Sequence, residues 1–144
     1  MAGKVSCARW HRLGQDPAVR YAVIVFLVQR VALSAWAALV LAVVPLQTVL
    51  EHGQQFYLGQ EPIIGGWRGL LLGAWQRWDT LWYLKIAAQG YSLADTSIFA
   101  PPLYPLLMRG LGALLGGEYL LAGLVVSSLA YLLALVYFYK LCLL

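Results

Sequence analysis

Charged residues are scarce in this chain. Lysine, arginine, aspartate and glutamate together make up 11% of its 144 residues, whereas a soluble domain carries about 25%. Hydrophobic residues make up 62%, and the mean hydropathy is +0.73. A water-soluble fold of this size could not cover that much apolar surface, because soluble domains are only about 45–50% apolar. The composition therefore predicts an all-α integral membrane protein surrounded by membrane lipid.

The chain also has few of the residues that metal sites and disulfide frameworks need. Its two cysteines, Cys7 and Cys142, lie at opposite ends and form no CxxC pair. Its two histidines, His11 and His52, are too far apart in the sequence to predict a metal cluster. The two Gly-Gly pairs lack the flanking strand and helix of a phosphate-binding loop. We therefore expect no metal site and no nucleotide-type cofactor.

Positive charge gathers at the N-terminus. Lys4, Arg9, Arg12 and Arg20 precede the first long apolar run, with only Asp16 against them. Such a bias places a flank on the cytoplasmic side of a membrane. A basic segment can also bind nucleic acid, but the topology signal already explains these charges, and we expect no nucleic-acid partner.

Long apolar runs define the expected membrane helices. Residues 1–20 form a basic cytoplasmic segment, and residues 21–44 form a first transmembrane helix. Its 24 residues reach roughly 36 Å, enough to cross a hydrocarbon core of about 30 Å and too long for a signal peptide. An extracytoplasmic loop covers 45–102, a short second transmembrane helix 103–116 and a third 119–140. Three helices with two internal arginines predict the N-terminal part of a longer polytopic chain.

The loop is expected to contain an interfacial helix at residues 79–89. Asp79 can act as its N-cap or first-turn acid, and Gly90 can close its C-terminus. Eleven residues are too few to cross a bilayer, and the aromatic content indicates a helix along the membrane surface. Further short helices are possible around 47–56 and 67–74.

Four of the six tryptophans lie within the sixteen residues 67–82. The simplest interpretation is an aromatic belt that anchors the loop at the interface. That interpretation does not explain the charges of Arg77, Asp79 and Lys85. A carboxylate on a partly dry aromatic surface can have a tuned pKa and act as a base, and a neighbouring cation can hold a phosphate. The alternative is a capping aspartate beside an interfacial arginine.

Two ordered motifs in this region resemble one enzyme family. Residues 77–91 read RWDTLWYLKIAAQGY, similar to the pattern RWDxxWYxxIAxxGY, and residues 99–109 read FAPPLYPLLMR, similar to FFPLYPLLxR. These patterns are those of the PIG-V-like mannosyltransferases, related to the second mannosyltransferase of GPI-anchor synthesis, with bacterial relatives. The resemblance covers roughly residues 21–140 and is most specific at 75–109. Ala100 and Pro101 depart from the usual Phe-Phe-Pro.

The resemblance implies a GT-C type glycosyltransferase that transfers a sugar, expected to be mannose, from a polyprenyl-phosphate carrier to an acceptor hydroxyl. A lipid-linked sugar donor is therefore expected, no cofactor is identifiable from the sequence, and the sequence leaves metal dependence open. An essential acidic residue of the first extracytoplasmic loop corresponds to Asp79. The implied location is the bacterial cytoplasmic membrane, or the endoplasmic reticulum membrane in a eukaryote, with the site on the extracytoplasmic side and the remainder of the polytopic chain as a partner. The alternatives are a non-catalytic assembly partner, a truncated pseudoenzyme and a transporter fragment.

Further residues are candidates for binding the sugar or the lipid phosphate. Arg77 and Lys85 can stabilise the phosphate charge or hold lipid headgroups, and Tyr83 and Tyr104 can stack on the substrate or anchor the interface. An arginine nine residues into the first span, Arg30, must face a partner or a cavity. Its expected role is structural or carrier-binding. For Arg109 we expect a structural or topological role, with the side chain reaching toward an interface.

Overall fold

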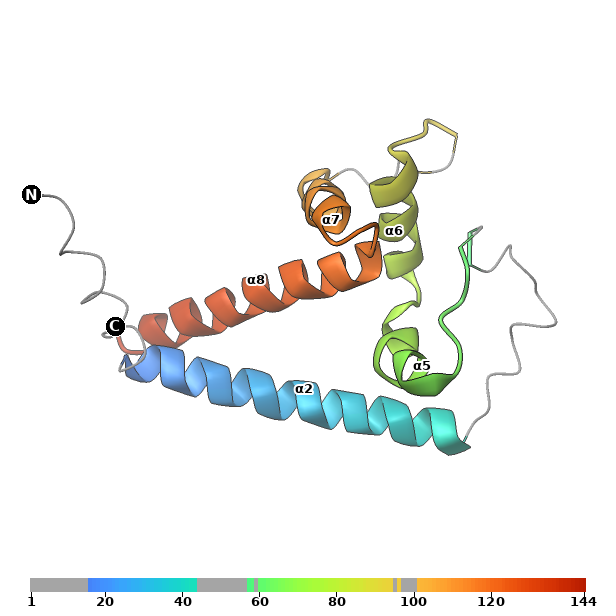
Figure 1. Cartoon of the computed structure of the whole chain (residues 1–144). Coiled ribbons are helices and arrows are strands. Elements are labelled where there is room, and N and C mark those ends of the chain that lie inside the picture. Colours follow the sequence, from blue (N-terminus) through green and yellow to red (C-terminus); the bar gives the residue numbers. More distant parts are fainter. Residues whose placement is uncertain (1–15, 44–56, 59, 95, 97–100) are drawn as a thin grey trace, which may run out of the picture. The chain divides into compact units, whose positions relative to one another are not determined.

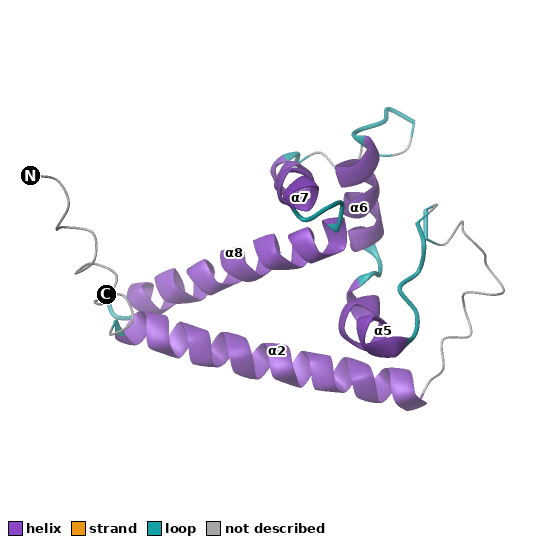
Figure 2. Ribbon diagram, in the orientation of Figure 1, coloured by secondary structure: helices purple, strands orange, loops and turns teal. Residues whose placement is uncertain are grey.

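The computed structural model of this chain describes residues 16–43, 57–58, 60–94, 96 and 101–144. Every regular element within these ranges is a helix (Figure 2), so the predicted all-helical class is confirmed for this part of the chain. The predicted short helix at 47–56 and the N-terminal segment up to residue 15 lie outside the described residues. The elements are α2 (Pro17–Val43), α5 (Gly66–Leu72), the 3₁₀ turn η1 (Gly73–Trp75), α6 (Asp79–Gln89), α7 (Leu103–Leu114) and α8 (Tyr119–Leu141) (Figure 1).

The chain forms two compact units. The first, which we call the helical pair, joins residues up to Leu33 with residues from Ser128 onward, and so combines parts of α2 and α8. The second unit, residues 34–127, contains α5, η1, α6, α7 and the start of α8.

Helix α2 begins four residues earlier than the sequence predicted, at Pro17. The carboxylate of Asp16 accepts a hydrogen bond from the Ala18 amide at 2.9 Å, which is the capping contact of an N-cap aspartate. Proline is favoured at the next position because its fixed φ suits a helix and it has no amide to satisfy. The Asp-Pro signal therefore determines the start of the helix, ahead of the apolar run.

The two helices of the helical pair run antiparallel. Their contacts match rising residue numbers on α2 with falling numbers on α8. They are the Asp16–Lys140 ion pair at 3.0 Å, the Tyr21–Tyr139 ring stack at 5.6 Å, the Phe26–Tyr131 ring contact at 6.1 Å, the Gln29–Tyr131 hydrogen bond and the Arg30–Ser128 hydrogen bond at 2.8 Å. The hydrogen bond from Lys140, together with that from the Ala18 amide, holds the pKa of Asp16 below its usual value.

Two helices are long and apolar enough to cross a membrane, within Pro17–Val40 and Tyr119–Leu141. These two helices correspond to the first and third predicted spans, and the second predicted span corresponds to a shorter apolar helix, α7. Helix α7 has 12 residues and a length of roughly 18 Å, well short of a hydrocarbon core of about 30 Å. Its end is determined by a Schellman turn, in which the Gly117 amide donates to the Gly112 carbonyl at 2.8 Å and Gly116 has a φ of 70°.

Helices α6 and α7 lie side by side and hold the core of the second unit (Figure 1). Leu84 and Ala87 of α6, Met108 of α7 and Leu120 of α8 form this buried cluster. Gly123 lets α7 and α8 approach closely, because an added Cβ would lie 2.9 Å from the Met108 methyl carbon. This packing supports α6 from behind and leaves its N-terminal end at the surface.

Candidate functional site

Asp79 is the first residue of α6, within the predicted helix 79–89. Its side chain is exposed, and no hydrogen bond or ion pair joins its carboxylate to another described residue. A carboxylate in the first turn interacts favourably with the partial positive charge of the helix N-terminus. Of the two helical positions predicted for it, Asp79 occupies the first turn, and Trp78 is the N-cap residue.

Trp78 has a strained backbone. Its φ of 52° and ψ of −131° lie in a region that a bulky residue rarely adopts, at a cost of about 1–3 kcal/mol. Its side chain is 88% exposed, so burial of the indole in the protein core does not explain the strain. Strained residues of this kind gather at functional sites.

A hollow of about 350 Å³ lies at this end of α6, and we call it the Asp79 hollow. Its lining comes from the turn before α6, from α6 itself and from α7, and consists of Ala74, Trp75, Arg77, Trp78, Asp79, Thr80, Tyr83 and Tyr104. Asp79 and Tyr104, which belong to the two different sequence motifs and are 25 residues apart, thus contribute to one surface. Four of the predicted site residues meet here: Arg77, Asp79, Tyr83 and Tyr104.

The two tyrosines join the motifs directly. The rings of Tyr83 and Tyr104 meet edge to face with their centroids 5.1 Å apart, a favoured aromatic geometry. The Tyr104 hydroxyl donates to the Gly123 carbonyl at 3.2 Å. Both rings are therefore held in place by their neighbours, which suits a wall against which a ligand stacks.

The two predicted cations differ in position. The guanidinium of Arg77 lies over the ring of Tyr57 at 6.0 Å and lines the Asp79 hollow. The ammonium of Lys85 lies over the ring of Trp82 at 5.7 Å and does not line it. Arg77 is therefore the better candidate for holding a phosphate beside Asp79.

The two arginines predicted inside apolar segments have identifiable surroundings. Arg30 belongs to the helical pair, where it donates to Ser128 Oγ at 2.8 Å and lies 5.6 Å from the Phe26 ring centroid. The guanidinium of Arg109 lies near Gly90, 3.7 Å from where a Cβ on that residue would be. A cation beside the C-terminal end of α6 complements the helix dipole, which favours a structural role for Arg109.

Gln76 is a residue that the sequence did not single out. Its side chain is buried at 4% exposure and bonds to the preceding loop at both ends of the amide. It accepts from the Ile63 amide at 2.8 Å and donates to the Glu61 carbonyl at 2.9 Å. We call this pair of bonds the Gln76 clamp. It anchors the loop directly before the Arg77–Asp79 segment, and a lone glutamine carries no sequence signal that could reveal such a role.

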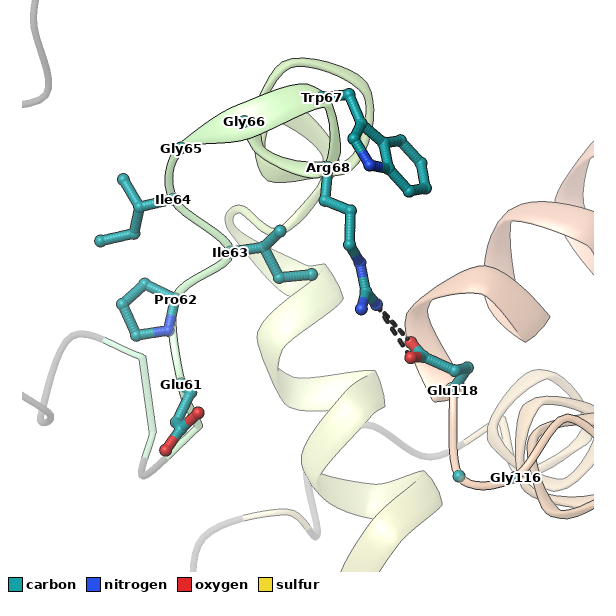
Figure 3. A pocket seen from close by; sticks show the side chains of 11 residues that line it. Glu61, Pro62, Ile63, Ile64, Gly65, Gly66, Trp67, Arg68, Gly116 and Glu118 are labelled. Carbon is teal, nitrogen blue, oxygen red and sulfur yellow. Dashed lines mark hydrogen bonds and ion pairs between the residues drawn. The ribbon is translucent and has the colours of Figure 1, made fainter.

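A second, larger hollow of about 740 Å³ lies between the loop at 61–66, the start of α5 and the turn before α8. Figure 3 shows Arg68 extending from α5 toward Glu118, with the Trp67 ring beside it. Arg68 Nη2 contacts both carboxylate oxygens of Glu118, at 2.8 and 3.0 Å. We call this the Arg68 hollow; the sequence predicted no site there.

Within the described residues, no group of three or more histidine, cysteine, aspartate or glutamate side chains could hold a metal ion. Comparison with family models, curated proteins and solved structures found no match to this chain.

Proposed function

We propose that this chain is a membrane glycosyltransferase that moves a sugar, on its motif resemblance mannose, from a polyprenyl-phosphate carrier to an acceptor hydroxyl. The observation that supports it most is the meeting of the two motifs in the Asp79 hollow. A carboxylate, a guanidinium and two fixed tyrosine rings face one small volume there. This is the set of groups that a sugar phosphate donor and a hydroxyl acceptor require.

In the proposed reaction, Asp79 acts as the general base. Its carboxylate takes the proton of the acceptor hydroxyl while that oxygen forms a bond to the anomeric carbon of the sugar. The bond from the anomeric carbon to the phosphate oxygen breaks, and the electron pair leaves on the carrier phosphate. The sugar configuration inverts because attack and departure occur on opposite faces. Since Asp79 has no described protein partner, its carboxylate is available to a substrate hydroxyl.

Arg77 stabilises the charge that develops on the leaving phosphate. A guanidinium offers a planar fork of donors that matches phosphate oxygens. Lining the hollow beside Asp79, it can act on the leaving oxygen while the carboxylate acts on the acceptor. Tyr83 and Tyr104 supply flat, partly apolar faces on which a sugar ring can stack.

The helical pair supports a membrane arrangement with two crossings. Because α2 and α8 are antiparallel, the start of α2 and the end of α8 reach the same face of a bilayer. In this arrangement the segment that joins the two spans stays on the opposite face, and α7 does not cross the membrane. With the basic N-terminus inside, both motifs lie on the extracytoplasmic side, where a lipid-linked donor is used.

The test is Asp79→Asn in the full-length protein, assayed in membranes for transfer from a polyprenyl-phosphate hexose. Loss of a general base lowers the rate by about 10²–10⁴-fold, while Asp79→Glu keeps a carboxylate and is expected to retain part of the activity. Asp16→Asn is the matched control, because that carboxylate caps α2 in the other unit. Unchanged transfer by a well-expressed Asp79→Asn protein would falsify the catalytic role.

A further inference from the structure

The Arg68 hollow has the size of a small-molecule site. Its volume of about 740 Å³ is within the roughly 300–1,000 Å³ of typical ligand pockets. All of its lining belongs to the second unit: Glu61, Pro62, Ile63, Ile64, Gly65, Gly66, Trp67, Arg68, Gly116, Gly117 and Glu118. The four glycines have positive φ values, and an added Cβ on any of them would meet nothing within 4 Å. Their lack of side chains therefore helps to keep the hollow open.

The polar groups of this hollow are suited to hydroxyls. The Arg68 and Glu118 side chains stay 48% and 44% exposed although they form an ion pair. Only one nitrogen of the Arg68 guanidinium is engaged by Glu118, and none of its other donors bonds to a described residue. Donors and acceptors thus lie side by side at an accessible edge, a pattern that adjacent sugar hydroxyls can match by donating to the carboxylate and accepting from the guanidinium.

The indole ring of Trp67 adds an aromatic face to the polar groups of the Arg68 hollow. Trp67 is 69% exposed and makes no ring contact with another described residue. In Figure 3 its ring lies beside the Arg68 side chain at the edge of the hollow. The negative face of an aromatic ring attracts the polarised C–H groups of a sugar ring as well as covering its apolar side.

The charge of the lining argues against an anionic ligand. Glu61 and Glu118 oppose a single guanidinium, which leaves one net negative charge. A phosphate would have to displace Glu118 from Arg68 and then lie near two carboxylates. A neutral ligand has no such penalty. The Arg68 hollow therefore differs from the Asp79 hollow, where one arginine balances one aspartate.

We propose that the Arg68 hollow binds a neutral, hydroxyl-rich sugar, the acceptor of the transfer reaction. The role of this sugar as the acceptor rests on the proposed transferase function. The binding of a sugar rests only on the residues that line the hollow. The Gln76 clamp connects the two sites, since it bonds to Glu61 and Ile63 in the wall of the hollow and directly precedes Arg77. An acceptor held here lies on the loop that the clamp fixes to the Asp79 segment.

The first experiment measures binding to the full chain in lipid nanodiscs by saturation-transfer NMR. The probes are methyl glycosides of neutral hexoses, with inorganic phosphate as the anionic comparison. We expect the glycosides to bind and phosphate not to compete. Trp67→Ala is expected to weaken glycoside binding about two- to tenfold through loss of stacking. Arg68→Lys keeps the charge but loses the planar fork, and is expected to weaken binding without unfolding the protein.

Leu71→Ala is the matched control. Leu71 is 54% exposed on the same helix and does not line the hollow. If α5 only touches the bilayer, Trp67→Ala and Leu71→Ala will both lower the affinity for lipid vesicles and neither will change glycoside binding. That result overturns the proposal, as does the absence of binding by every glycoside or equal binding of phosphate.

The second experiment separates this proposal from the proposed function. With a polyprenyl-phosphate hexose, the Arg68→Lys protein should show an acceptor KM about tenfold higher. Its donor KM and its hydrolysis of the donor by water should stay unchanged. An unchanged acceptor KM in an active enzyme overturns the acceptor site and leaves Asp79 in its role. A wild-type chain that binds glycosides but neither transfers nor hydrolyses contradicts the transferase and supports the sugar site.

Discussion

Removal of the Gln76 clamp should destabilise the second unit. Gln76→Leu has a similar volume but makes neither the bond to the Ile63 amide nor the bond to the Glu61 carbonyl. Two neutral hydrogen bonds contribute about 2 kcal/mol net. Glu61 is exposed, so water can replace the lost hydrogen bond to its carbonyl. Ile63 is half-buried, so water replaces the lost hydrogen bond from its amide less easily. The expected loss in the free energy of unfolding is therefore about 2–3 kcal/mol.

Gln76→Glu tests the direction of the two bonds through pH. A carboxylate still accepts from the Ile63 amide, but its second oxygen faces the Glu61 carbonyl and cannot donate. Burial and that repulsion both raise the pKa of the new glutamate above the usual value of about 4.3. A raised folded-state pKa gives stability that is present below the unfolded value and is lost as the pH rises through the folded value. The variant should therefore be close to wild type in acid and weaker at neutral pH.

The assay is denaturation of the detergent-solubilised chain, followed by tryptophan fluorescence at several pH values. Gln89→Glu is the matched control, because Gln89 is exposed at the end of α6, and its change should stay below about 1 kcal/mol. A Gln76→Leu protein within about 0.5 kcal/mol of wild type, or a Gln76→Glu protein whose loss does not depend on pH, would refute the clamp.

Two further outcomes concern the helical pair. The first uses a membrane-impermeant maleimide on a protein that lacks Cys7. If the antiparallel pair crosses the membrane twice, the reagent should label a Leu93→Cys variant in intact cells and should label Cys142 only after permeabilisation. Labelling of Cys142 in intact cells would favour three crossings. Lys140→Gln should raise the pKa of Asp16 toward its usual value of 3.8, with only the Ala18 amide still lowering it. The stability that the lowered pKa contributes is present above the usual value and is lost as the pH falls through the lowered one. The wild type should therefore lose more thermal stability than the variant between pH 7 and pH 3, and equal losses would contradict the pairing.

Local signals predicted much of the secondary structure. The helix at Asp79–Gln89 has the predicted range, with Gly90 closing it at a φ of 91°. The two long apolar helices also lie where the hydropathy indicated. Proline, glycine, capping side chains and apolar run length act over a few residues, so they can be read without knowing the neighbours in space. The helix predicted at 103–116 forms at Leu103–Leu114, two residues shorter because it ends at its Schellman turn, and its crossing of the membrane stays a prediction.

The sequence by itself determined that this chain is helical and rich in membrane-length apolar segments, and it marked Asp79 and its neighbours as the unusual chemistry. Only the tertiary structure decided which side chains meet. Arg30 and Ser128 are 98 residues apart in the sequence, and Arg68 and Glu118 are 50 apart. Such contacts depend on the direction in which helices return and on the packing of the core. No local propensity encodes either, which is why the Arg68 hollow and the Gln76 clamp had to be seen in the fold.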